Sequence, residues 1–160
     1  MLKINIIAVG KIKEKYLTDA CNEYIKRLGA FCNINITEIA EHKCAQNPSD
    51  ADIDAVLKNE GKRILAAIPQ SAEVIAMCIE GEMLSSDKLA AKIQKSATSG
   101  TSCICFVIGG SWGLDESVKQ RADYLLSMSP MTFPHMLARV MLLEQIYRAF
   151  SINKGTKYHK

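Results

Sequence analysis

The sequence contains no apolar run near the ~20 residues that a helix needs to cross a bilayer. Its first residues, Met1–Asn5, lack the apolar core and the cleavage site of a secretory signal peptide. We therefore expect a cytoplasmic protein without a membrane partner. With 160 residues, 48% of them hydrophobic and 23% charged, the chain has the size and balance of one globular domain, residues 1–160.

Paired zinc ligands are also missing. A structural zinc site needs Cys-x2-4-Cys pairs, and the six cysteines do not supply them. Cys78, Cys103 and Cys105 lie in apolar runs, where cysteine behaves as a small core residue. Thiols stay reduced in the cytosol, so we expect neither a metal site nor disulfides.

A dinucleotide-binding fingerprint is absent too. G-x-G-x-x-G should open a helix after an early strand, with an acidic residue about 20 positions on. This chain has G-G-x-x-G at Gly109–Gly113, after the fourth expected strand, and no phosphate-binding lysine follows. The spacing argues against an NAD site and against a P-loop.

Positive charge is modest overall but concentrated at one end. The net charge is +3, and Pro130–Lys160 carries +4, which leaves −1 on the preceding 129 residues. A local basic surface suits a polyanion such as nucleic acid. A solvated tail explains the same charge equally well.

Segments typical of strands alternate along the chain with segments typical of helices. The strands are indicated by short apolar runs, and the helices by apolar residues spaced three or four positions apart. The expected strands are Leu2–Val9, Cys32–Ala40, Glu73–Ile79, Ser102–Ile108 and Tyr124–Ser127. The expected helices are Glu14–Leu28, Asp50–Ala67 after Ser49, one capped by Ser85 or Ser86 and ending near Thr98, Asp115–Arg121 and Pro134–Ile152. This order predicts an α/β domain with a mainly parallel sheet and helices on both faces.

Ligands of open parallel sheets bind beyond the carboxyl ends of the strands. The segments expected there are Ile79–Gly81, Gly109–Gly113 and Ser127–Phe133. Glycines in the second let a ligand approach the backbone, but they also suit a simple tight turn. The third is either an ordinary strand-to-helix connection or a seat for a flat adenine, held by main-chain hydrogen bonds and apolar side chains.

The last expected helix has charged groups at spacings of four. His135 and Arg139 share one face, and Glu144 and Arg148 form a favourable pair. The charge of an arginine in a buried helix requires a partner, which is either an acidic side chain of the same protein or an anionic substrate. The terminal Tyr158–Lys160 offers groups that stack on a base and contact phosphate, although chain ends are often disordered.

Together these segments resemble the bacterial pseudouridine N3-methyltransferases of the large ribosomal subunit, which belong to the SPOUT class. The resemblance spans the whole chain and departs from the family pattern at Met136, often Gln, and Lys157, often apolar or Pro. The roles of those two side chains stay open. The matching segments are Ala8–Lys11, Ile108–Ser111, Met131–His135, Leu143–Ala149 and Tyr158–Lys160.

The resemblance implies a trefoil knot in the C-terminal half, with knotted loops that hold S-adenosyl-L-methionine in a bent shape. It further implies a homodimer with active sites at the subunit interface. The substrate would be a pseudouridine of 23S rRNA in the assembled ribosome, methylated at N3. Carried over by position, the cofactor contacts are Met77, Gly109, Met128, Ser129, Pro130, Met131, Thr132 and Phe133.

The chemistry needs alignment and loss of a proton. The sulfonium methyl is already activated, so the enzyme chiefly aligns it with N3. Histidine titrates near neutral pH, which makes His135 and His159 candidate bases. Arg139 or Arg148 could stabilise the anion on the carbonyl oxygens, and Tyr158 could stack on the base. We favour an arginine as anion stabiliser, with water or His159 taking the proton.

Two other functions remain open. One is methylation of tRNA, for example at a ribose 2′-OH, although many such enzymes carry an extra RNA-binding domain that this chain lacks. The other is a non-catalytic RNA- or nucleotide-binding module. The first predicts methyl transfer to free tRNA, and the second predicts binding without transfer.

Overall fold

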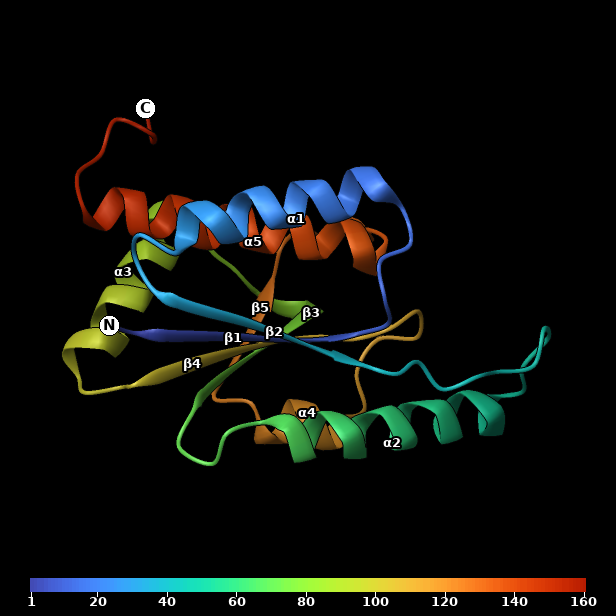
Figure 1. Cartoon of the computed structure of the whole chain (residues 1–160). Helices are drawn as coiled ribbons and strands as arrows, with labels where there is room; N and C mark the ends of the chain where they lie inside the picture. Colours follow the sequence, from blue (N-terminus) through green and yellow to red (C-terminus); the bar gives the residue numbers. More distant parts are fainter.

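The computed structural model describes residues 1–160 and shows one five-stranded sheet between two layers of helices (Figure 1). The strands are β1 (Lys3–Val9), β2 (Asn33–Ile39), β3 (Glu73–Met83), β4 (Cys103–Ile108) and β5 (Tyr124–Ser127). The helices are α1 (Lys15–Leu28), α2 (Asp50–Ala67), α3 (Ser86–Thr98), α4 (Glu116–Arg121) and α5 (His135–Asn153). All strands pair in parallel, in the order β2-β1-β4-β3-β5, which confirms the predicted fold class.

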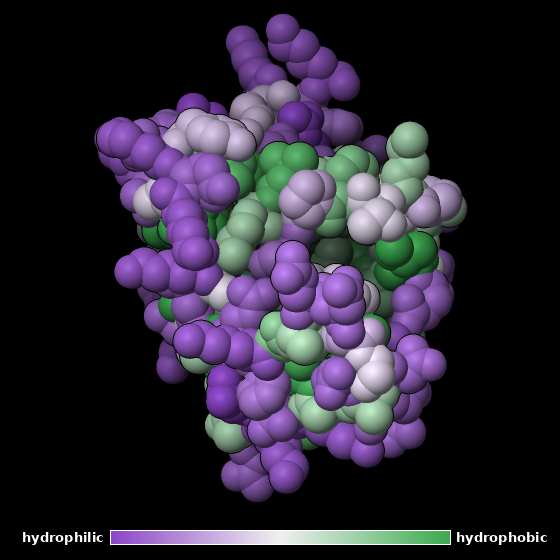
Figure 2. All heavy atoms as spheres, turned by 90° about the vertical axis from the view of Figure 1, so that its right-hand side faces the viewer, coloured by the Kyte–Doolittle hydropathy of each residue, from purple (hydrophilic) through white to green (hydrophobic).

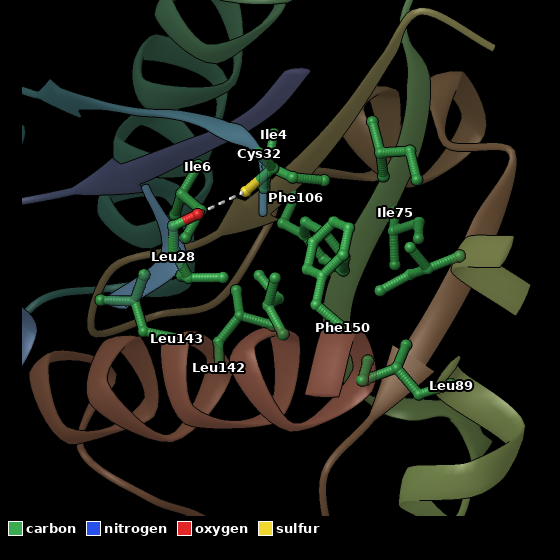
Figure 3. Close-up of a cluster of buried hydrophobic side chains, with 14 of the residues drawn as sticks. Ile4, Ile6, Leu28, Cys32, Ile75, Leu89, Phe106, Leu142, Leu143 and Phe150 are labelled. Atoms are coloured by element: carbon green, nitrogen blue, oxygen red, sulfur yellow. Dashed lines mark hydrogen bonds between the residues drawn. The ribbon is translucent and has the colours of Figure 1, made fainter. Parts of the chain in front are cut away.

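Both faces of the sheet are buried. α1, α3 and α5 cover one face, and α2 and α4 cover the other (Figure 1). Along β1, Ile4 and Ile6 join the first core while Ile7 and Val9 join the second, because alternate residues of a strand point to opposite faces. β4 is buried at every position, which explains its wholly apolar sequence. Figure 3 shows Phe106 of β4 in the first core, facing α5.

Helix starts follow the predicted capping. The Ser49 hydroxyl accepts the Asp52 N–H at 3.1 Å, and the Asp52 carboxylate accepts the Ser49 N–H at 2.9 Å, which forms a capping box. Of the two candidates before α3, Ser85 is the cap, and its hydroxyl accepts from Lys88 N at 3.2 Å. Pro134 is the N-cap residue of α5, so the helix begins at His135, one position after the predicted helical start. None of the helices has the length and apolarity needed to span a bilayer.

The predicted end of β3 was wrong. The strand continues through Ile79–Gly81 to Met83, so that segment is no loop. β3 pairs with β5 up to Met77 and again from Glu82, with a register shift between. A Cβ on Gly81 would lie 2.7 Å from backbone carbons of Leu125 and Leu126, so this crossing needs glycine. Sequence alone reads the polar Glu-Gly-Glu run as a loop because pairing with β5 is a tertiary effect.

Arg139 fixes the start of α5 to the carboxyl ends of β1 and β2. Its side chain is only 5% exposed, and the guanidinium donates to Glu38 Oε2 at 2.8 Å and to the Gly10 carbonyl oxygen at 3.0 Å. Of the two reasons for an arginine in this helix, the intramolecular ion pair applies here.

Glu38→Ala should destabilise the fold because it leaves the buried Arg139 cation with a single carbonyl partner. We expect a loss of about 1–3 kcal/mol in unfolding free energy, below the ~3–5 kcal/mol of fully buried pairs because Glu38 is 41% exposed. Denaturant unfolding measures it. The control is Glu23→Ala, which breaks an exposed pair with Arg27 and should change stability by less than about 0.5 kcal/mol. Equal losses in the two variants would contradict this assignment.

Candidate functional site

A cavity of about 850 Å³ opens at the carboxyl ends of β3, β4 and β5. Its walls come from the outer half of β3, the Gly109–Leu114 loop, the connection between β5 and α5, and the start of α5. Half of the lining residues are hydrophobic. Figure 2 shows this side of the molecule, where hydrophobic surface borders a hollow among polar groups. The cavity therefore lies where a parallel sheet is expected to bind its ligand.

The predicted cofactor residues gather around this cavity, with the exception of Pro130, which is not among its lining residues. Those that line it are Met77, Gly109, Met128, Ser129, Met131, Thr132 and Phe133. Trp112, Glu80 and Lys119 also line it, although the sequence assigns no role to these three side chains. Trp112 and Glu80 belong to segments that the sequence predicts at the ligand site, whereas Lys119 comes from α4, and only the folded chain brings it here.

The glycine loop is both a tight turn and a cavity wall, so the two interpretations of its sequence hold together. The Gly113 N–H donates to the Gly110 carbonyl at 3.1 Å, and Gly113 has φ +86°. A Cβ on Gly109 would stand 2.4 Å from the Gly113 carbonyl oxygen, a distance that no side chain tolerates. Glycine at 109 thus lets the two limbs of the turn touch while its backbone faces the cavity.

Polar groups brace this turn from behind. Glu60 of α2 is 3% exposed, and its Oε1 would be 3.2 Å from a Cβ on Gly110. The other oxygen, Oε2, accepts the His42 N–H at 3.0 Å. The Ser111 hydroxyl donates to Glu41 Oε1 at 3.3 Å. These contacts join the turn to α2 and to the segment after β2. The sequence does not predict them, because nothing in the pattern of α2 distinguishes Glu60 from the other charged residues of that helix.

Glu60→Gln should alter how stability depends on pH. Burial raises the pKa of the Glu60 carboxyl above its ordinary value, while the His42 N–H lowers it by a smaller amount. The folded state therefore keeps this proton to a higher pH than the unfolded chain, and stability falls as pH rises from about 4.3 through the folded pKa. Glutamine removes that loss, so the stability of the variant relative to the parent should be higher at about pH 7 than at about pH 4. Denaturant unfolding at both values is the measurement, and a constant or reversed difference would contradict the prediction.

The predicted catalytic residues fall into separate places. His135 lines the cavity, and its Nε2 atom is buried without a hydrogen-bond partner. Arg139 is not among the lining residues and is held by Glu38 and Gly10. Arg148, in the second half of α5, lies together with Tyr158 and His159 of the segment that follows the helix. Only His135 thus faces the cavity of its own chain.

The C-terminal residues fold back on α5 in what we call the tail cluster: Glu144, Arg148, Tyr158 and His159. Arg148 donates to Glu144 Oε1 at 2.7 and 3.0 Å and lies 3.3 Å from His159 Nδ1. The Glu144 carboxylate raises the pKa of the Arg148 guanidinium. The Tyr158 hydroxyl donates to Glu144 Oε1 at 3.1 Å, and the Arg148 guanidinium lies 4.7 Å from its ring centroid. Burial, aided by hydrogen bonds, raises the pKa of Tyr158 to about 12, so its phenol stays protonated at neutral pH.

The tail cluster is separated from the large cavity. Glu144 stands about 14 Å from His135 along the axis of α5, at about 1.5 Å per residue. A second cavity of about 490 Å³ lies beside Glu144, between α1, the start of α3 and α5. It shares the wall formed by Leu126, Ser127 and Met128 with the large cavity. No group of three or more His, Cys, Asp or Glu side chains is placed to hold a metal ion.

Comparisons with known proteins agree with this architecture. Residues 2–159 match a family described as "Predicted SPOUT methyltransferase". The chain is 54% identical over 159 residues to a Bifidobacterium adolescentis protein named "Ribosomal RNA large subunit methyltransferase H", covering 99% of this chain and 100% of that one. A solved structure, a probable methylase family protein from Haemophilus influenzae Rd KW20, has a TM-score of 0.52 at 13% identity. That match covers 99% of this chain and 70% of that one, and it shows the fold alone. With the family match spanning almost all residues, the chain belongs to the SPOUT methyltransferase family.

Proposed function

We propose that this protein transfers a methyl group from S-adenosylmethionine to N3 of a pseudouridine in 23S rRNA, acting on the assembled ribosome in the cytoplasm. The observation that carries the proposal is the cavity at Gly109, because nearly all positions implied as cofactor contacts line it. The name of the Bifidobacterium relative supports ribosomal RNA of the large subunit as the substrate class. Residues 1–160 act as one catalytic domain.

The residues of the cavity fit S-adenosylmethionine. The N–H groups of Thr132 and Phe133 have no hydrogen-bond partner in the protein, so they are available to the polar edge of an adenine. The preceding residues are already ordered, since Ser129 Oγ accepts the Met131 N–H at 3.0 Å and the Ser127 hydroxyl donates to the Ser129 carbonyl at 3.1 Å. Gly109 lets the opposite wall approach without a side chain. The expected trefoil knot would bring these two walls together around one ligand.

Bound S-adenosylmethionine supplies a methyl group activated by positively charged sulfur. The protein then has to align the base, stabilise the N3 anion and accept the N3 proton. We assign anion stabilisation to Arg148 and the proton to His159 or water. His135 lines the cavity, but its Nε2 is buried beside Gly10, so we assign the proton to His159 or water rather than to His135. Arg139 acts indirectly, by fixing the start of α5 beside the cavity.

A homodimer reconciles this assignment with the distance between the tail cluster and the cavity. Tyr158 and His159 do not line the cavity of their own chain. A second copy packed against α5 would bring its own tail to this cavity, so each active site would combine the pocket of one subunit with the tail of the other.

The decisive experiment incubates the protein with methyl-labelled cofactor and assembled ribosomes, isolated large subunits or tRNA. Mass spectrometry of RNA fragments then locates the label. We expect one methyl group on a pseudouridine of 23S rRNA, at the highest rate in assembled ribosomes. Label in tRNA would replace the proposal with the tRNA enzyme, and binding without transfer would favour the non-catalytic module.

A further inference from the structure

Three exposed apolar side chains surround the mouth of the cavity. Trp112 is 46% exposed, Ile79 53% and Met131 73%, and all three are lining residues. They come from three segments, the outer half of β3, the loop after β4 and the connection after β5. Large apolar groups gathered at one opening mark a surface that is covered when a partner binds.

Trp112 is held in place before any partner arrives. It occupies the turn closed by the hydrogen bond from Gly113 to Gly110, and its neighbour Ser111 is tied to Glu41. Glu60 and Val9 pack beneath the same turn at Gly110. An aromatic ring on an ordered turn loses little conformational freedom on binding, so more of its contact energy appears as affinity.

The charge at the rim favours a base over a phosphate beside Trp112. The cation in this wall, Lys119, forms an ion pair with Glu80, so it is already neutralised. The exposed indole of Trp112 is flat and apolar, and such a surface stacks on the face of a nucleobase.

We propose that Trp112 stacks on the RNA base next to the methylated pseudouridine and so positions the substrate, an inference that rests on the function proposed above. N3 lies on the pairing edge of the base, so methylation requires that the target leave its pair and stack. Its neighbour then loses a stacking partner, and the indole replaces it. Trp112 is a positioning residue, because it contacts the adjoining nucleotide rather than the reacting atoms.

Steady-state kinetics with ribosomes test the proposal. Trp112→Ala should raise the KM for ribosomes by about 5- to 150-fold, the range for a lost base-stacking contact, with the Kd for S-adenosylmethionine unchanged. Trp112→Phe keeps an aromatic face and should recover most of the affinity. Tyr16→Ala is the control, since Tyr16 is 72% exposed but does not line the cavity, and it should change neither constant. A loss of cofactor affinity in Trp112→Ala, or an unchanged KM, would overturn the proposal.

A second measurement is independent of turnover. Trp112 is the only tryptophan of the chain, so its fluorescence reports on this side chain alone. A 23S rRNA fragment containing the pseudouridine should quench the emission of the cofactor-loaded protein. RNA binding without quenching would overturn the stacking proposal. The proposed function is judged separately, by whether the unmodified protein methylates ribosomes.

Discussion

Gly109→Ala should weaken cofactor binding severely while the protein stays folded. The added Cβ would lie 2.4 Å from the Gly113 carbonyl oxygen and 2.6 Å from its carbon, and both are backbone atoms. Neither can rotate away as a side chain would, so the turn has to open into the cavity. We expect the Kd for S-adenosylmethionine to rise by roughly 100-fold or more, about 2.7 kcal/mol, in calorimetric titration.

Gly113→Ala is the matched control in the same turn. Gly113, unlike Gly109, has a positive φ, at +86°, but a Cβ there meets nothing within 4 Å. It therefore adds conformational strain of about 1–2 kcal/mol without a collision. Melting temperature reports whether each variant is folded. Cofactor affinity that is equal in the two variants would show that the close approach at Gly109 does not shape the cofactor site.

Deleting Tyr158–Lys160 should stop methyl transfer and leave cofactor affinity unchanged. The tail lies outside the large cavity, so its loss does not disturb the cofactor walls. Its contacts with Glu144 and Arg148 are partly exposed, and removing them should cost about 1 kcal/mol, or about 2–4 °C in melting temperature. Loss of base stacking alone lowers binding by about 5- to 150-fold, and loss of His159 adds to the effect. Deleting only Lys160 should retain most of the activity.

Mixed dimers reveal which subunit the tail serves. At a cofactor concentration near the Kd of the unmodified protein, the tail deletion and Gly109→Ala should each be nearly inactive. A dimer of one with the other, however, has an intact cavity on one chain and an intact tail on its partner. If the tail acts across the interface, random pairing should restore about a quarter of normal activity, because half of the dimers are mixed and each has one complete site. No recovery in confirmed mixed dimers would place the tail at its own cavity, and full activity of the deletion alone would make it dispensable.

Local pattern was enough to predict the elements of this fold. Apolar runs mark β1 and β4, and Ser49 and Ser85 cap their helices as serine before an apolar spacing predicts. The outer half of β3 was not predicted, because its residues form a strand only through pairing with β5. The order of the strands in the sheet was not predicted either, because the alternation of apolar and polar residues within a strand does not identify its neighbours.

The residues of the candidate site likewise fall into those that the sequence identifies and those that only the folded chain brings together. The cofactor residues implied by resemblance to a family all line one cavity except Pro130, because their positions follow the motif along the chain, and their contact with the cofactor stays a prediction. Contacts between distant segments escaped prediction: Glu38 meets Arg139, Glu60 supports Gly110, and Lys119 meets Glu80. Helical spacing put Arg139 and His135 on one face, but it could not tell that one is committed to an ion pair while the other faces the cavity.

The strand order also governs when this protein can begin to work during its synthesis. Lys3 of β1 pairs with Cys103 of β4, so the centre of the sheet forms only after a distant part of the chain has been made. Closing such long loops slows folding. Every wall of the large cavity comes from residues after Ala76, and its last wall is the start of α5. A chain emerging N-terminus first therefore completes this cavity, the proposed cofactor site, only after all five strands have been made. Binding of S-adenosylmethionine would then distinguish finished molecules from nascent ones.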